Sequence, residues 1–349
     1  MSEATLPLWR KRLFGTPATA VGTFVIAFCI AWIAVPFLRW ALIDANWSGT
    51  SRNDCTAGGA CWVFIRARFG QFMYGLYPAD QRWRVDLTGI LFLLSVVAIV
   101  FAPKRLQLRL GLFSLVILPP LGIWLLAGGF VLRPVETREW GGLMLTLFIS
   151  VYSSLIAIPL GILFALGRQS ELKVIRLVSI LFIEFWRGVP IIAVIFLASL
   201  LLPLILPSGV GIDRLARAVI GLGLVIAAYM AEAVRGGLQA LPSGQREAAT
   251  ALGLTYWKAT GLIILPQALR ISLPAMTNEF IALVKNTTLV LVVSILDLLG
   301  IAQASLADPS WVGMNMEAYF FSGGIYWLIC YGLSRWSRAL ERRGRQRQR

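Results

Sequence analysis

Long runs without charge are the feature that most constrains how this chain can fold. A membrane-spanning helix needs about 20 apolar residues, and such runs recur along the 349 residues. The clear candidates are residues 17–38, 87–102, 110–132, 142–167, 188–206, 215–234, 280–301 and 318–334. Because only closed hydrogen-bonded structures cross a bilayer, we predict an all-α, polytopic helical membrane protein with about eight transmembrane helices.

Composition agrees with a membrane protein, since 58% of the residues are hydrophobic and 14% are charged, against about 25% charged in soluble domains. The net charge of +15 would also suit a nucleic-acid-binding protein. However, the basic residues stand in short clusters between apolar runs, and no nucleic-acid-binding motif accompanies them. We therefore expect membrane lipid, and no nucleic acid, among the partners.

The basic residues also predict orientation. Eight spans place both termini on one side, and that side holds twenty of the 32 basic residues against ten on the other. Lys and Arg are enriched in cytoplasmic loops, so both termini are predicted to be cytoplasmic. The outer loop 41–84 opposes this trend with five arginines. Its aromatic stretch 61–77 is interpreted either as a helix in the membrane interface or as a partly buried lid.

Histidine is absent, which removes Ser-His and Cys-His catalysis and the usual zinc sites, so no metal site is expected. Of the four cysteines only Cys55 and Cys61 are close in sequence. They form a disulfide if their loop faces an oxidising compartment, and remain two thiols otherwise. Both interpretations stay open.

The cytoplasmic loop 235–270 is rich in small residues, and its helical pattern is interrupted twice. Ser243 is a candidate N-cap, and Glu247 falls in the first turn, where a carboxylate favours the helix dipole. Gly253 is a candidate C-terminal stop, Thr255 can cap a second helix, and Pro266 is expected to end the apolar run that follows. The loop is thus predicted to be two short helices joined at a glycine. It serves either to dock into a partner or simply to connect two spans.

The same loop resembles a known signature. The spacing matches the EAA motif of ABC importer permeases without a gap: Glu247, Ala248, Ala249, Gly253, Ile263, Leu265 and Pro266. Three flanking stretches look like the polar amino-acid branch of these permeases: FWRGVP (185–190), AYMAEAVRGGLQALPSGQREAATALG (228–253) and NEFIALVKNTTLV (278–290). The resemblance to a five-helix type I core covers about 140–340. Three extra N-terminal helices resemble the general L-amino-acid permeases of Gram-negative bacteria.

The resemblance implies a mechanism and partners. In this family the EAA loop docks in a cleft of a separate ABC ATPase subunit, and closure of an ATPase dimer swings the spans between inward-facing and outward-facing states. The chain lacks the GxxxxGK[ST] phosphate loop, so it is expected to be non-catalytic and to hold no cofactor, with ATP and Mg bound by the partner. A second homologous permease subunit or a second copy, a periplasmic amino-acid-binding protein and a bacterial inner-membrane location are also implied.

The motifs suggest a division of the chain. Residues 1–139 are expected to form accessory helices with the outer loop 41–84. Residues 140–340 would form the permease core with its coupling loop 242–266, and residues 341–349 a basic cytoplasmic tail.

Two further groups are candidates for the translocation path. Glu232 and Arg235 stand three residues apart and favour a local ion pair over substrate contact, while Arg187 lies at the edge of a span. A polar cluster within the first turns of the span 280–301 is predicted to line the pore or an inner gate, or to make interhelix hydrogen bonds: Lys285, Asn286, Thr287 and Thr288.

Two other functions are alternatives to the ABC permease. A secondary amino-acid transporter coupled to an ion gradient often shows paired interrupted helices and internal repeats, and no repeat is visible here. An intramembrane enzyme would need a nucleophile and a base, but histidine is absent and the cysteines are scattered.

Overall fold

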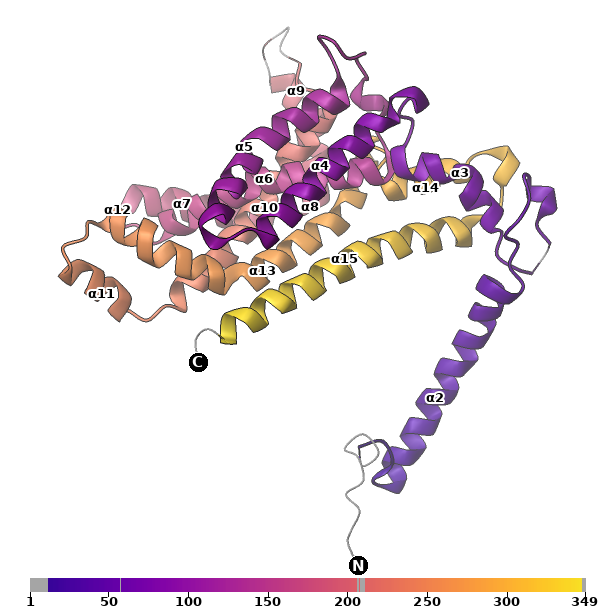
Figure 1. The fold of residues 1–349 in the computed structure, drawn as a ribbon, viewed down its shortest axis with the longest axis horizontal. Helices are drawn as coiled ribbons and strands as arrows, with labels where there is room; N and C mark the ends of the chain where they lie inside the picture. Colours follow the sequence, from indigo (N-terminus) through magenta and orange to yellow (C-terminus); the bar gives the residue numbers. More distant parts are fainter. Residues whose placement is uncertain (1–11, 57, 206, 208–210, 347–349) are drawn as a thin grey trace, which may run out of the picture. The chain divides into compact units, whose positions relative to one another are not determined.

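The computed structural model describes residues 12–56, 58–205, 207 and 211–346, and over these residues the regular elements are helices (Figure 1). Arg10, Lys11 and the end of the basic tail at 347–349 lie outside the described residues. The α-helices are α2 (Pro17–Leu38), α3 (Trp62–Tyr74), α4 (Arg82–Phe101), α5 (Lys104–Ala127), α6 (Gly142–Arg168), α7 (Lys173–Gly188), α8 (Ile191–Leu200), α9 (Leu202–Ile205), α10 (Arg214–Gln239), α11 (Gly244–Ala251), α12 (Tyr256–Ala259), α13 (Leu265–Asn286), α14 (Leu298–Leu306) and α15 (Asn315–Gln346).

Six helical segments of the described chain are long and apolar enough to cross a membrane: Pro17–Ile43, Ala79–Phe101, Arg105–Ala127, Gly142–Arg168, Arg214–Gln239 and Tyr256–Val293. The pair α7 and α8, bent by 100°, makes a seventh if it is one broken span. The all-α membrane fold is thus confirmed, with a count close to the predicted eight. The eighth expected span lies in α15, where Tyr, Trp, Ser and Gly interrupt the apolar residues.

Two expected spans have wrong boundaries. The run 188–206 is not one helix: Gly188 ends α7, Val189 and Pro190 separate it from α8, and α8 ends at Leu200 before the short α9. A residue before proline is disfavoured in the α region, and Val189 is extended at φ −89° and ψ 132°. The run 280–301 is not one helix either. Its first residues, 280–286, are the end of α13, which begins at Leu265. Further on, Ser294 turns the chain with a left-handed backbone.

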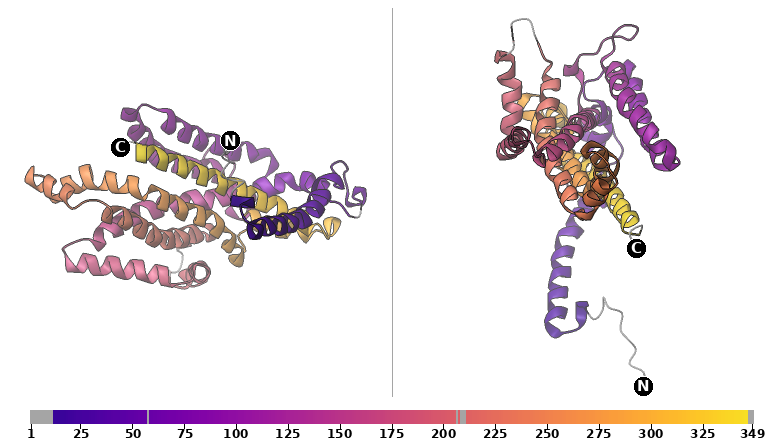
Figure 2. Two further views of the ribbon diagram at one scale, coloured as in Figure 1. Left: turned by 90° about the horizontal axis from the view of Figure 1, so that it is seen from below. Right: turned by 90° about the vertical axis from the view of Figure 1, so that its left-hand side faces the viewer.

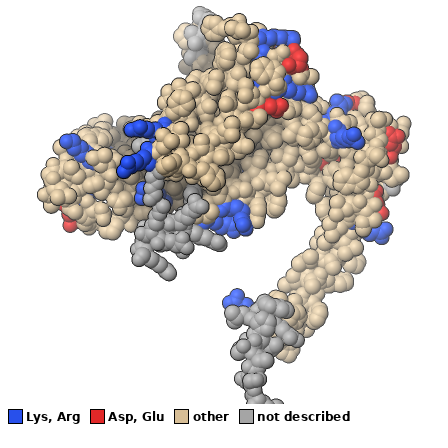
Figure 3. Space-filling model, in the orientation of Figure 1, with Lys and Arg blue, Asp and Glu red and all other residues tan. Residues whose placement is uncertain are grey.

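The described chain forms two compact units, the described residues of 12–68 with 306–318, and those of 69–305 with 319–346. In the second unit α10 is central and packs against α6, α7, α8 and α13 (Figures 1 and 2). Its glycines allow close approach: a Cβ on Gly237 would lie 2.4 Å from the carbonyl oxygen of Ala268 on α13. The middle of the face shown in Figure 3 carries few charged side chains, as a lipid-facing surface requires.

The first unit contains α2, which has no buried residue. Thr16 and Thr19 form a reciprocal capping box at its start, and Pro17 occupies the first helical position, where its missing N–H costs nothing. A helix that is apolar all round is typical of a membrane span. The division at residue 139 follows motifs rather than contacts and stays a prediction.

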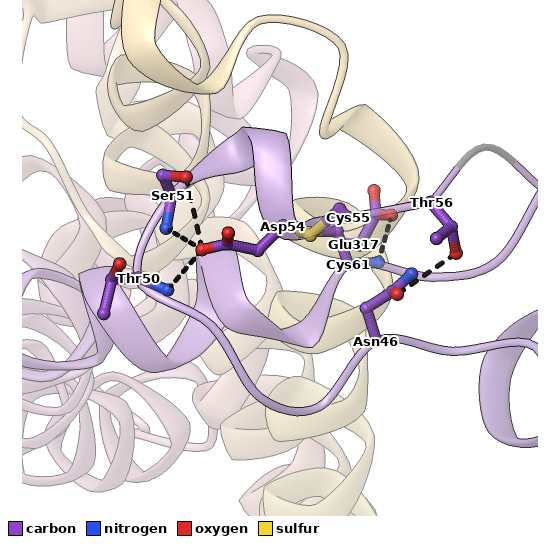
Figure 4. The surroundings of a disulfide bond; sticks show 8 residues. All are labelled: Asn46, Thr50, Ser51, Asp54, Cys55, Thr56, Cys61 and Glu317. Atoms are coloured by element: carbon purple, nitrogen blue, oxygen red, sulfur yellow. Dashed lines mark hydrogen bonds between the residues drawn. A yellow bond between two sulfur atoms is a disulfide. The ribbon is translucent and has the colours of Figure 1, made fainter.

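One loop of the first unit is held by a disulfide between Cys55 and Cys61, whose Cα atoms are 5.6 Å apart (Figure 4). The backbone N–H of Cys61 donates to the buried Glu317, 2.9 Å away. Nearby, backbone N–H groups of Thr50 and Ser51, each 2.8 Å from the carboxylate, hold the pKa of Asp54 below its usual range. The loop is therefore a folded element. Helix α3 lies within the predicted aromatic stretch 61–77, and it buries Val63, Phe64 and Phe72.

Removal of this disulfide tests its contribution. Replacing Cys55 and Cys61 with serine should lower the local stability of the loop by about 2 kcal/mol, the loop-closure entropy for so short a ring. Limited proteolysis of the purified protein should then cut the loop faster. Cys330→Ser is the control, because Cys330 is a free cysteine. Equal cleavage rates for the double variant and this control would show that the bridge adds nothing.

Candidate functional site

The loop between α10 and α13 contains the predicted first short helix and its glycine, but the predicted second short helix is the start of a longer helix. Helix α10 ends at Gln239, α11 runs over Gly244–Ala251, and α12 over Tyr256–Ala259. Glu247 lies in the first turn of α11 and is exposed. Ala248 is exposed while Ala249 is buried, so one face of α11 packs on the protein and the other is open.

Gly253 ends α11 through a Schellman motif, which confirms it as the helix stop. Its φ is +72°, a left-handed conformation that glycine adopts without steric cost. The N–H of Gly253 donates to the carbonyl of Thr250 (2.9 Å), and the N–H of Leu254 donates to that of Ala249 (3.1 Å). These two bonds define the motif. A Cβ at Gly253 would meet nothing within 4 Å, so its backbone conformation alone demands glycine.

Two predicted N-caps are wrong in detail. Ser243 has a helical backbone (φ −56°, ψ −33°) and its side chain makes no cap hydrogen bond. Thr255 is extended as an N-cap should be, but its hydroxyl also makes no cap bond. Exposed N–H groups at a helix start are readily satisfied by water, so these two positions do not need side-chain caps.

The helix that starts at α12 continues past Pro266, which we expected to end the apolar run. A π-helical turn, Thr260–Ile264, precedes the proline. Proline cannot donate to the carbonyl four residues back, and a π turn shifts that hydrogen-bonding register. The side chain of Gln267 donates to the carbonyl of Ile263 (2.9 Å) and lies 3.4 Å from the Gln245 side chain on α11. Ile263, Leu265 and Pro266 thus lie where the π turn joins α13.

Large apolar side chains project from this loop. The exposed fractions are 78% for Leu252, 76% for Trp257 and 73% for Leu262. The loop also borders an open cavity of about 560 Å³, lined by Leu238, Leu241, Pro242, Ser243, Arg246, Glu247, Thr250 and Ile264. An apolar surface with polar anchors of this kind is typical of a protein-interaction site.

Glu232 is the centre of an ion network at the end of α10 near the loop. Its carboxylate lies 2.5 Å from Arg235, 2.6 Å from Arg168 on α6 and 3.9 Å from Arg187 on α7. Arg168 also contacts Glu184, 3.1 Å away. The predicted pair is present, but its contact with Arg168, and that of Arg168 with Glu184, were not predicted from the sequence. The five charged side chains of this network come from α6, α7 and α10. Glu232 is the least exposed of them, with 17% of its side chain exposed.

The polar cluster 285–288 lies elsewhere in its helix than predicted. It stands at the end of α13 and the start of a 3-10 segment, η6 (Thr287–Val293), instead of in the first turns of a span. Lys285 follows Leu265 by 20 residues, about 30 Å along a helix, so it is far from the loop. Lys285 is exposed and Asn286 and Thr288 are half-buried, whereas Thr287 is buried.

Comparisons with known proteins agree with this geometry. A model of the family described as binding-protein-dependent transport system inner membrane component matches residues 157–346. The chain is 48% identical over 335 residues to the inner membrane amino-acid ABC transporter permease protein YhdY of Escherichia coli strain K12, covering 96% of this chain and 91% of that protein.

Of two further comparisons, one covers nearly the whole chain and the other covers little more than half of it. The glutamate/glutamine/aspartate/asparagine transport system permease protein BztC of Rhodobacter capsulatus is 36% identical, with 96% of this chain and 92% of that protein covered. A solved structure described as an amino acid ABC transporter with histidines is similar with a TM-score of 0.52 and 33% identity. It covers 58% of this chain and 92% of that chain.

Proposed function

This chain belongs to the family of binding-protein-dependent transport system inner membrane components, and from this premise we propose how its parts serve transport. Its function is that of a membrane permease subunit of an amino-acid ABC transporter. Such a subunit is not an enzyme: it works with a separate ATPase and a binding protein. Its location is the inner membrane.

The loop 242–266 is the coupling element for the ATPase. This assignment is supported chiefly by α11, whose open face carries Glu247 and Ala248. The exposed side chains of Leu252 and Trp257 follow beyond it. Such a surface is costly to leave in water and fits a cleft on an ABC ATPase dimer. ATP and Mg are bound by that dimer, and no cofactor is assigned to this chain. Through the π turn before Pro266, movement of α11 is transmitted to α13.

The remaining assembly follows from the same role. A second permease subunit, either homologous or a second copy, completes the path, and a periplasmic amino-acid-binding protein delivers the substrate. Both termini lie in the cytoplasm, on the side of the coupling loop. Polar L-amino acids are the proposed substrate class, because the two full-length relatives are named for amino-acid transport.

The path itself is lined by polar residues of the described helices. Arg187, Glu232 and Arg235 form its loop-proximal part, and Lys285, Asn286, Thr287 and Thr288 its distal part. An amino acid carries both charges, so its carboxylate needs a cationic donor and its ammonium an acidic or carbonyl acceptor. Arginine supplies the cationic donor in the loop-proximal part of the path, and lysine supplies it in the distal part.

Reconstitution tests the proposed function. The chain, with its partner permease, is placed in liposomes with and without the ATPase subunits, and uptake of labelled amino acids is measured with ATP on the ATPase side. Uptake is expected only with the ATPase, the binding protein and ATP together. Uptake driven by an ion gradient without the ATPase would contradict the proposal and favour a secondary transporter.

Replacement of Lys285 with methionine tests the distal part of the path. Methionine keeps the length of the stem and deletes the charge, so acidic amino acids should lose more transport than neutral ones. The expected change in the ratio of their uptake rates is about fivefold, corresponding to the 1 kcal/mol typical of a partly exposed charge contact. Arg335→Met, at an exposed position of α15, is the control. Unchanged kinetics for acidic, neutral and basic amino acids would remove Lys285 from the path.

A further inference from the structure

Asp297 is a fully buried carboxylate between η6 and α14, with 0% of the residue exposed. Its Oδ1 accepts the N–H of Gly300 (2.9 Å) and so caps α14. Its Oδ2 accepts the hydroxyl of Tyr326 on α15 (2.7 Å) and lies 3.3 Å from the hydroxyl of Thr287. One side chain therefore joins α14, α15 and the junction between α13 and η6.

Helix α6 holds the same turn from the other side. The N–H of Gly142 donates to the carbonyl of Leu296 (3.0 Å), and the hydroxyl of Thr146 accepts the N–H of Leu298 (3.0 Å). Ser294 has a left-handed backbone, with φ 57°. A residue other than glycine keeps that conformation only where its surroundings fix it. The turn 294–298 is thus held in place by contacts with four helical segments, α6, η6, α14 and α15.

The junction held by this turn is an unusual piece of helix. Segment η6 has seven residues of 3-10 helix, whereas such runs rarely exceed three or four, and longer ones often mark a hinge. Thr287 begins it and is 0% exposed. Its neighbours are the exposed Lys285 and the half-buried Thr288. Among the described residues, no Lys or Arg is within ion-pair distance of Asp297, so hydroxyl and amide donors alone hold it.

We propose that Asp297 is a positioning residue for transport. Through Thr287 it fixes the orientation of the α13–η6 junction, and thereby the direction in which Lys285 and Thr288 face the substrate path. The inference rests on the proposed place of this junction on the path. It separates substrate recognition from energy coupling, because the coupling loop lies at the other end of α13.

The test uses the Asp297→Asn variant of the complete complex in liposomes. Asparagine keeps the volume but presents an amide donor toward Thr287 or Tyr326, which breaks part of the hydrogen bonding. The apparent KM for amino-acid uptake should rise about fivefold or more, while the ATPase remains bound. Ser153→Ala is the matched control: Ser153 is a buried α6 hydroxyl that donates to the Val219 carbonyl (3.0 Å).

A second readout follows the junction directly. Thr288→Cys is introduced into a chain whose free cysteines, Cys29 and Cys330, are replaced by alanine, and its thiol-labelling rate is measured with and without Asp297→Asn. The labelling rate should change about fivefold, the same factor as expected for the apparent KM. If Asp297→Asn does not assemble, Tyr326→Phe removes one donor and should give a smaller change of the same kind.

The two readouts fail in different ways. An unchanged labelling rate in an assembled complex would overturn positioning by Asp297. A changed labelling rate with an unchanged KM would instead overturn the place of the junction on the substrate path.

Discussion

Replacing Gly253 with valine is expected to reduce substrate-stimulated ATP hydrolysis about tenfold or more while the permease still inserts. The φ of +72° suits glycine, and an L-residue in the left-handed region costs about 1–2 kcal/mol. A free-energy cost of 1.4 kcal/mol is a factor of ten in an equilibrium. The chain can escape the strain only by breaking the Schellman bonds, which would turn Leu252 and the exposed face of α11 away from the ATPase.

The control for this variant is Gly244→Val. Gly244 begins the same helix, a Cβ there meets nothing within 4 Å, and its φ is outside the left-handed region. The two variants add the same side chain to the same exposed loop, so a difference between them isolates the backbone conformation. ATP hydrolysis and uptake are measured on complexes matched for ATPase content. Normal coupling in Gly253→Val would contradict the role of this turn, and equal loss in both variants would point to crowding of the docking face.

The coupling loop was predictable because its structure is set by local backbone chemistry. Gly253 stands where a helix of small residues must stop, and its left-handed conformation depends on bonds to residues only three and five positions back. The continuity of α12 with α13 was not predictable in this way. Pro266 and Pro274 both suggest interruptions, yet a π turn absorbs the first and the helix includes the second. The shifted start of this helix is also why Lys285 was assigned to the wrong end.

The ion network shows a different limit. Glu232 and Arg235 are three residues apart, so the helix repeat alone predicts their pairing. Arg168 is 64 residues from Glu232, and only the packing of α6 on α10 brings them together. The available signal was a charge at the end of an apolar run, since charges in spans tend to pair with one another. That signal identifies Arg168 as a candidate but not its partner. Asp297 is a similar case, because its contacts come from α14, α15 and η6.

The second large effect is expected for Glu232→Gln, which removes the carboxylate that Arg168, Arg187 and Arg235 share. Breaking a fully buried ion pair costs about 3–5 kcal/mol. The three arginine side chains are 25–37% exposed, so water screens part of their charge. We expect a loss of about 2 kcal/mol, measured as a lower melting temperature of the detergent-solubilised complex and a matching loss of uptake.

The control removes a carboxylate of the same kind from an open pair. Glu136 lies 2.8 Å from Arg138, and their side chains are 66% and 79% exposed, so Glu136→Gln should change stability by no more than about 0.5 kcal/mol. A double-mutant cycle with Arg168→Gln then separates pairing from packing. If Glu232 acts through its charge, the double variant should lose less than the sum of the single losses, because the second substitution removes a cation already left unpaired. Additive losses would instead mean that Glu232 stabilises α10 by packing alone, and the three helices would not be joined by this network.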